Sequence, residues 1–191
     1  MRKFELTTDT KMFLGRKLFR IKALISFGNV RAGDMGGYIE KEENLSQSGD
    51  AWVSGNAKVS GDAKVSGDAK VFGNAWVSGN ARVSGDAEVS GDAWVSGNAK
   101  VFGNAWVSGN ARVSGDADYT TASGFGSEYR TTTFFKLKNS DEIGVRCGCF
   151  YGTLKEFKEK VKETHGESKK AKEYLMLADL MKYRFSEEKK A

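Results

Sequence analysis

Hydrophobic and polar residues alternate through the middle of this chain with a period of six. From Gly49 the sequence reads GDAWVS, GNAKVS, GDAKVS and onward through eleven full units, and it then ends in GDADYT, where the pattern decays. Within each unit Ala and Val are two residues apart, so on an extended strand both point to the same side, while the residue between them and the following Ser point to the other. The Gly-Asp or Gly-Asn pair supplies a turn. One such unit cannot bury a core alone, but stacked parallel units can, so the period predicts a solenoid.

The spacing resembles that of the bacterial transferase hexapeptide-repeat family, whose members fold as a left-handed parallel β-helix. Val53, Val59 and their successors match the aliphatic position of that repeat, and Ala51, Ala57 and their successors match its small-residue position. The resemblance covers residues 49–118 and implies that three hexads form one triangular coil. Twelve units then give about four coils, roughly 19 Å long at a strand spacing of ~4.8 Å.

Residues 1–48 are expected to form an N-terminal cap and a degenerate first coil. Two strand candidates, KFEL and KLFRIKALISF, precede Ile39 and Leu45, which are six residues apart as in the repeat. A cap is needed because an open solenoid end exposes unpaired backbone and valine. The segments LFRIKAL, GDMGGYIEKEENLS and the first GDAWV also resemble the start of hexapeptide solenoids from bacterial and phage genomes. Those relatives carry the labels transferase or polymer-forming protein, which are largely inherited from the repeat.

Residues 119–191 depart from the repeat, and we expect a small α+β module of ββαα order. Strands are predicted over Arg130–Lys138 and Ile143–Phe150, joined by the turn NSDE. Phe135 and Leu137 are expected to share one face of this hairpin with the apolar positions of the return strand, namely Ile143, Val145, Cys147 and Cys149.

Two helices should complete this module. Thr153 with Glu156 forms a capping box at the start of the first, which should stop near Gly166. Ser168 should start the second, whose apolar stripe comprises Ala171, Leu175, Ala178, Met181 and Phe185.

With eighteen residues per coil, the outward residues between Ala and Val stack into three ranks. The first face carries Trp52, Lys70, Glu88 and Trp106; the second face carries Lys58, Trp76, Trp94 and Arg112; the third face carries Lys64, Arg82, Lys100 and Asp118. Large exposed aromatic side chains mark interfaces. We therefore predict a binding or oligomerisation surface made of Lys58, Trp76, Trp94, Arg112, Trp52, Trp106, Phe72 and Phe102.

A duplication within the repeat favours a spacer over a ligand site along the solenoid. The segment VFGNAWVSGNARVSGDA occurs at 71–87 and again at 101–117, an offset of 30 residues that is not a multiple of eighteen. The second copy therefore falls on a different face, which a site of fixed geometry would not tolerate.

Catalytic chemistry is not expected. Hexapeptide acyltransferases use a histidine as general base and extrude a loop from a coil. The solenoid has no histidine and no inserted residue, and His165, the one histidine of the chain, lies at a predicted helix end, where it suits the helix dipole. We predict no catalytic residues, no cofactor and no metal site.

Composition and charge limit the kinds of partner that we expect. The formal net charge is +5, and the basic surplus lies in the two ends: residues 49–118 carry six basic and eight acidic side chains. No apolar run reaches membrane-spanning length and the start lacks the hydrophobic segment of a signal peptide, so no membrane association is expected. The two cysteines, in a Cys-Gly-Cys arrangement, suggest a reduced, cytoplasmic protein.

These observations favour a non-catalytic scaffold or binding protein that forms a homo-oligomer (a dimer or trimer) and binds a protein partner. Three alternatives stay open. They are a phage or mobile-element protein that inhibits a host factor, a hexapeptide-type acyltransferase, and a nucleic-acid binder that uses the basic ends.

Overall fold

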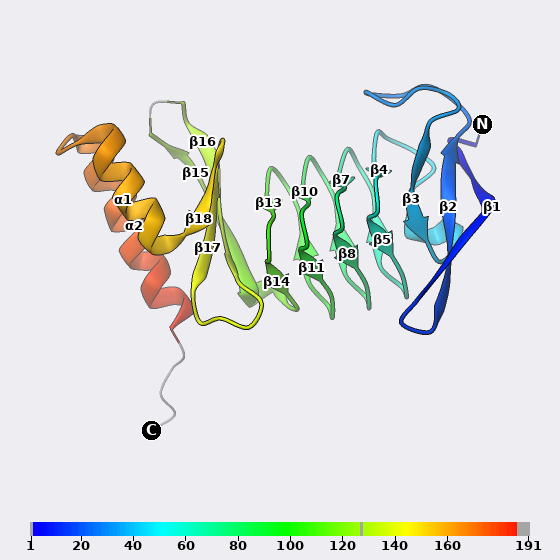
Figure 1. Ribbon diagram of the computed structural model, residues 1–191. Coiled ribbons are helices and arrows are strands. Elements are labelled where there is room, and N and C mark those ends of the chain that lie inside the picture. Colours follow the sequence, from blue (N-terminus) through cyan, green and yellow to red (C-terminus); the bar gives the residue numbers. More distant parts are fainter. Residues whose placement is uncertain (1, 127, 187–191) are drawn as a thin grey trace.

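The central feature of the computed structural model, which describes residues 2–126 and 128–186, is a parallel β-solenoid of about four turns (Figure 1). Each strand pairs in parallel with the strands one coil before and after it, so that Trp94 lies between Trp76 and Arg112. This register of eighteen residues confirms three hexads per coil. The eleven short strands are β4 (Trp52–Val53), β5 (Lys58–Val59), β6 (Lys64–Val65), β7 (Lys70–Val71), β8 (Trp76–Val77), β9 (Arg82–Val83), β10 (Glu88–Val89), β11 (Trp94–Val95), β12 (Lys100–Val101), β13 (Trp106–Val107) and β14 (Arg112–Val113).

The interior of the solenoid is a close-packed column of Ala and Val. From Ala51 to Val113 every core Ala and Val is at most 1% exposed, as the period predicts. Backbone hydrogen bonds join the coils, for example from Trp76 N to Ala93 O at 2.9 Å. Glycine is required at the corners: Gly91 has φ +67°, and a Cβ there would lie 2.8 Å from the backbone nitrogen of Gly109.

The N-terminal cap extends one face of the solenoid by hydrogen bonding. It consists of β1 (Phe4–Phe13), β2 (Arg16–Ala23), β3 (Met35–Ile39) and the short 3-10 helix η1 (Glu42–Asn44). Strand β3 runs parallel to β5, and β2 and β1 then continue the same seven-stranded sheet as antiparallel neighbours.

Ile39 and Leu45 take up the positions of the repeat before its first regular unit. Ile39 pairs with Val59, and Leu45 forms a parallel bridge to Val65. Strand β1 is longer than the predicted KFEL and carries Phe13 to the tip of a hairpin beside the solenoid.

The C-terminal module is α+β, but its sheet has four strands where two were predicted. They are β15 (Tyr119–Phe125), β16 (Arg130–Lys136), β17 (Ile143–Cys147) and β18 (Phe150–Thr153), all antiparallel, and they follow the 3-10 helix η2 (Asp116–Asp118). The predicted single return strand is divided because Gly148 takes φ +55° and turns the chain back.

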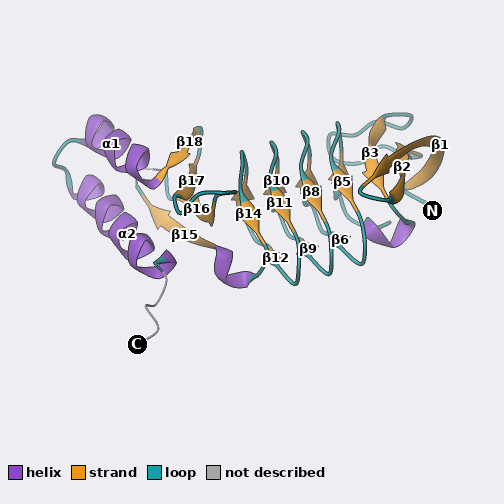
Figure 2. Cartoon of the chain, turned by 60° about the horizontal axis from the view of Figure 1, so that its bottom comes forward, coloured by secondary structure: helices purple, strands orange, loops and turns teal. Residues whose placement is uncertain are grey.

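The two predicted helices are confirmed as α1 (Leu154–His165) and α2 (Lys169–Phe185). Thr153 and Glu156 form the capping box, and the side chain of Ser168 caps α2. Figure 2 shows both helices at the end of the molecule opposite the N-terminal cap. Within the described residues, no helix is both long and apolar enough to cross a lipid bilayer.

The predicted face of the C-terminal hairpin is wrong by one residue in its first strand. Phe134 pairs with Val145, and Phe135 pairs with Gly144, so Phe134 shares the face of Ile143, Val145 and Cys147. That face packs on the helices and forms a core of its own. Phe135 points the other way, into the end of the solenoid, where Leu137 also packs.

One hydrophobic core therefore runs through the cap, the coils and the base of the C-terminal module. It includes Phe4 and Ile21 at one end, the Ala and Val column, and Tyr119 and Phe135 at the other. The two ends are fixed to the solenoid by the same packing that holds the coils together.

Candidate functional surfaces of the solenoid

The second face keeps its predicted order, and its two tryptophans contact each other. The rings of Trp76 and Trp94 meet edge to face with centroids 4.9 Å apart. Both side chains are half-buried and lie outside the core column, as predicted.

The N-terminal hairpin covers the beginning of this face. The ring of Phe13 packs edge-on against Trp76 at 5.1 Å, and the Lys58 Nζ lies 4.9 Å from the Phe13 ring. Lys58 is buried and donates to the backbone oxygen of Asn56. Burial, assisted by the nearby charge of Lys11, lowers the pKa of the Lys58 amine. Lys58, which the sequence analysis placed in the predicted binding surface, is thus covered within the chain, because β1 reaches past the first coil.

The C-terminal module covers the other end of the same face. Lys138 places its Nζ 4.3 Å from the ring centre of Trp94, and Arg112 lies 5.8 Å from that ring. Trp76 and Trp94 are thus flanked by the chain's own ends, and less of their surface is open to a second molecule than the sequence suggested.

The tryptophans of the first face are also engaged within the chain. Trp52 is buried rather than exposed, because Phe27 packs on it with ring centroids 5.4 Å apart. Phe27 belongs to the loop of residues 24–34 between β2 and β3, called here the N-terminal loop. Trp106 lies 3.5 Å beneath the guanidinium of Arg146 and donates its indole N–H to Ser90. Of the remaining predicted interface residues, Phe72 is half-buried and Phe102 is 60% exposed.

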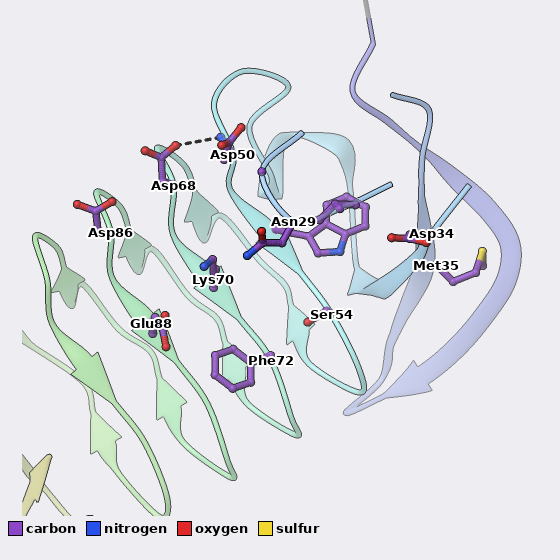
Figure 3. Close-up of a pocket in the computed structure, with 13 residues that line it drawn as sticks. Asn29, Asp34, Met35, Asp50, Ser54, Asp68, Lys70, Phe72, Asp86 and Glu88 are labelled. Atoms are coloured by element: carbon purple, nitrogen blue, oxygen red, sulfur yellow. Dashed lines mark hydrogen bonds between the residues drawn. The ribbon is translucent and has the colours of Figure 1, made fainter. Parts of the chain in front are cut away.

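A groove of about 710 Å³ opens between the N-terminal loop and the first face (Figure 3). The loop around Asn29 and Asp34 forms one wall, and the coils that carry Asp50, Asp68 and Asp86 form the other. The groove is also lined by Val30, Met35, Trp52, Lys70, Phe72 and Glu88.

This groove carries an excess of negative charge. Of the residues that the structure describes, five carboxylates line it and Lys70 is the one basic lining residue. Among the described residues, Asp50, Asp68, Asp86 and Glu88 form no ion pair.

A buried amine lies close to this groove. The Nζ of Lys3 donates to the backbone oxygens of Gly49 and Ala51 at 3.1 and 2.9 Å. Burial lowers the pKa of Lys3 to about 8, although Asp50 and Asp68 act in the opposite direction. Nothing in the sequence indicated this burial, because a lysine side chain is normally solvated.

The C-terminal module holds a smaller pocket of about 260 Å³, which gathers the single histidine and both cysteines of the chain. His165 stacks on Tyr174 with ring centroids 5.9 Å apart and lies in the last turn of α1, as predicted. Burial, and secondarily Cys147, raises the pKa of Tyr174 to about 12, and both thiols are free. The Cys-Gly-Cys motif and the lone histidine were visible in the sequence, but nothing there placed them together.

Comparison with known proteins supports the assignment of the β-solenoid repeat. The family model described as the YdcK beta solenoid repeat matches residues 75–91 and, in an overlapping window, residues 81–97. This part of the chain is similar to a known β-solenoid repeat. A search of curated proteins found no match.

Proposed function

We propose that this protein is a non-catalytic scaffold, in which the solenoid is a rigid spacer between two end modules and presents a side surface to a protein partner. The observation that carries the proposal is the single core that joins Phe4 of the cap to Phe135 of the C-terminal sheet. Because both ends share packing with the coils, the number of coils sets their separation and their relative rotation.

The absence of a histidine from the coils supports the non-catalytic part, because hexapeptide acyltransferases use a histidine as general base. The one histidine of the chain lies in the C-terminal module, stacked on Tyr174. The protein should release no coenzyme A thiol when incubated with acetyl-CoA and amine or hydroxyl acceptors. Turnover that a single substitution within the coils abolishes would restore the acyltransferase alternative.

Two deletions test the spacer. Removing Gly73–Ser90 takes out one coil of eighteen residues and puts Trp94 where Trp76 stood. Removing Gly85–Ser90 takes out one hexad and rotates the C-terminal module by about a third of a turn. The first variant should still capture its partners from host lysate, weakened only as far as the loss of Asp86 and Glu88 from the groove reduces binding, and the second variant should lose them. Equal capture by both would contradict a function that depends on the arrangement of the faces.

Inhibition of a host factor by a phage or mobile-element protein is a special form of this proposal, since it also needs a protein-binding surface.

For self-association, we favour an exposed face of α2 over the second face of the solenoid, which carries Trp76 and Trp94. Met176, Leu180 and Tyr183 lie three and four residues apart on that helix and are all strongly exposed. Sedimentation of Met176→Lys/Leu180→Lys tests it: a wild-type oligomer that becomes monomeric supports this face, and an unchanged oligomer contradicts it.

A further inference from the structure

We propose that the groove between the N-terminal loop and the first face binds an extended segment of a protein partner that is rich in lysine or arginine. The inference rests on the proposed scaffold function and specifies its partner. The solenoid has three corners, and at each of them the residue after the glycine stacks from coil to coil.

The corner beside the groove differs from the other two in charge. Its first three coils carry Asp50, Asp68 and Asp86 in succession, and Asn replaces Asp only at position 104. The other corners mix the two residue types: one reads Asn56, Asn74, Asp92 and Asn110, and the other reads Asp62, Asn80, Asn98 and Asp116.

In the two mixed corners, side chains of neighbouring coils form hydrogen bonds with one another. Asn74 donates its amide to Asp92 at 3.1 Å, and Asn80 donates to Asn98 at 3.0 Å, so a side-chain hydrogen bond links neighbouring coils in each of these corners, while Asp62 forms an ion pair with Lys41. A carboxylate cannot donate in this way. In the acidic corner the corresponding bond comes from the backbone N of Asp50 to Asp68.

The acidic corner is therefore a row of like charges one coil apart, about 5 Å, which a cationic ligand would relieve. Glu88 adds a carboxylate from the outward rank of the first face, and Lys70 is the one basic side chain among the described residues that line the groove. The Lys3 amine beside the groove offsets part of the charge of Asp50 and Asp68.

The shape of the groove favours a polypeptide over an ion. Its volume of about 710 Å³ holds several side chains, and Val30, Met35 and Phe72 offer apolar surface to the stems of lysine or arginine. Among the described residues no group of three or more acidic, histidine or cysteine side chains is placed to hold a metal ion. Nucleic acid is disfavoured because its phosphates would meet the same carboxylates.

The repeat itself supplies isostructural variants for the test. Asp68→Asn/Asp86→Asn removes two charges from the groove, and Asp62→Asn/Asp92→Asn removes two from the other corners. Both variants should fold, because Asn occupies equivalent corners in the native chain and the ion pair of Asp62 with Lys41, which the control variant loses, is exposed. Equal melting temperatures would verify this.

The probe is a fluorescein-labelled octapeptide of alternating lysine and alanine, with a glutamate-alanine peptide as control, measured by anisotropy at low salt. The lysine peptide should bind, more weakly as salt rises. Its dissociation constant should increase about fivefold for Asp68→Asn/Asp86→Asn and stay nearly unchanged for the control pair.

Three results would overturn the proposal. They are no binding of the lysine peptide to the wild-type protein, equal weakening by both double substitutions, or a calcium-dependent rise in melting temperature that only the groove variant loses. The spacer function would survive any of them, because the coil deletions test it without the peptide.

Discussion

The two ends of the solenoid are closed by different means. At the N-terminal end the sheet continues, since β3 pairs in parallel with β5 and β2 and β1 extend it further. At the C-terminal end a separate sheet lies across the last coil, joined to it by side-chain packing and by a few backbone contacts such as Lys138 N to Asn110 O. A hydrogen-bonded cap should unfold together with the coils, whereas a packed module with a second core should be able to loosen alone.

Two adjacent phenylalanines of β16 provide the strongest test of whether the C-terminal module can unfold separately from the coils. Phe135 belongs to the core of the solenoid and Phe134 to the core of the helices, and both are fully buried. Each substitution to Ala should cost about 3–5 kcal/mol of unfolding free energy. Phe135→Ala should raise hydrogen exchange in the last coils, while Phe134→Ala should raise it in α1 and α2 alone. Identical exchange patterns would show that the two cores unfold as one.

The pH dependence of the unfolding free energy tests whether the Lys3 amine is buried at the N-terminal end of the solenoid. The folded pKa of about 8 lies below the ordinary value of 10.5, so between these pH values the unfolded chain binds more protons and stability rises with pH. Below pH 8 both states are protonated and the cost of burying the charge is fully present. Relative to Lys3→Met, the wild-type protein should gain stability from pH 8 to 10.5, and the gain should stay below about 3 kcal/mol because solvent screens part of the charge. Parallel denaturant titrations with no change in this difference would mean that the amine is solvated.

A smaller loss of stability is expected when the contact between Trp76 and the β1–β2 hairpin is removed. Trp76 contacts Phe13 and Trp94 and donates to Ser60. Trp76→Ala should cost about 2 kcal/mol and increase hydrogen exchange at the tip of the β1–β2 hairpin. Phe102→Ala is the exposed control and should change little. A stability unchanged by Trp76→Ala would show that the hairpin is not held by this contact.

The smallest effect is expected at the start of α1. Thr153 accepts from Glu156 N, and Thr153→Ala should cost about 1 kcal/mol in thermal melts. Thr153→Ser retains the acceptor and should behave like the wild-type protein; equal loss in both would assign the effect to packing.

The sequence predicted most of the fold because the information lay in local periods. The Ala–Val spacing specified the core, and the eighteen-residue coil placed Trp94 between Trp76 and Arg112. The helices were readable from Thr153, Gly166 and Ser168, which cap or end them.

What the sequence could not provide was contact between distant segments. Phe13 and Lys138 reach the tryptophan rank from the two ends, and Phe27 buries Trp52. Such contacts depend on where a hairpin tip or a loop comes to rest. The acidic corner was different: sorting the turn residues by coil position would have revealed it.

The distance between the two ends tests the central claim most directly. Spin labels on Lys17→Cys and Lys162→Cys, in a Cys147→Ser/Cys149→Ser background, can be measured by pulsed electron paramagnetic resonance with and without deletion of Gly73–Ser90. A rigid spacer predicts one narrow distance distribution that shortens by about 5 Å with unchanged width. A broad distribution, or a mean distance that the deletion leaves unchanged, would contradict it.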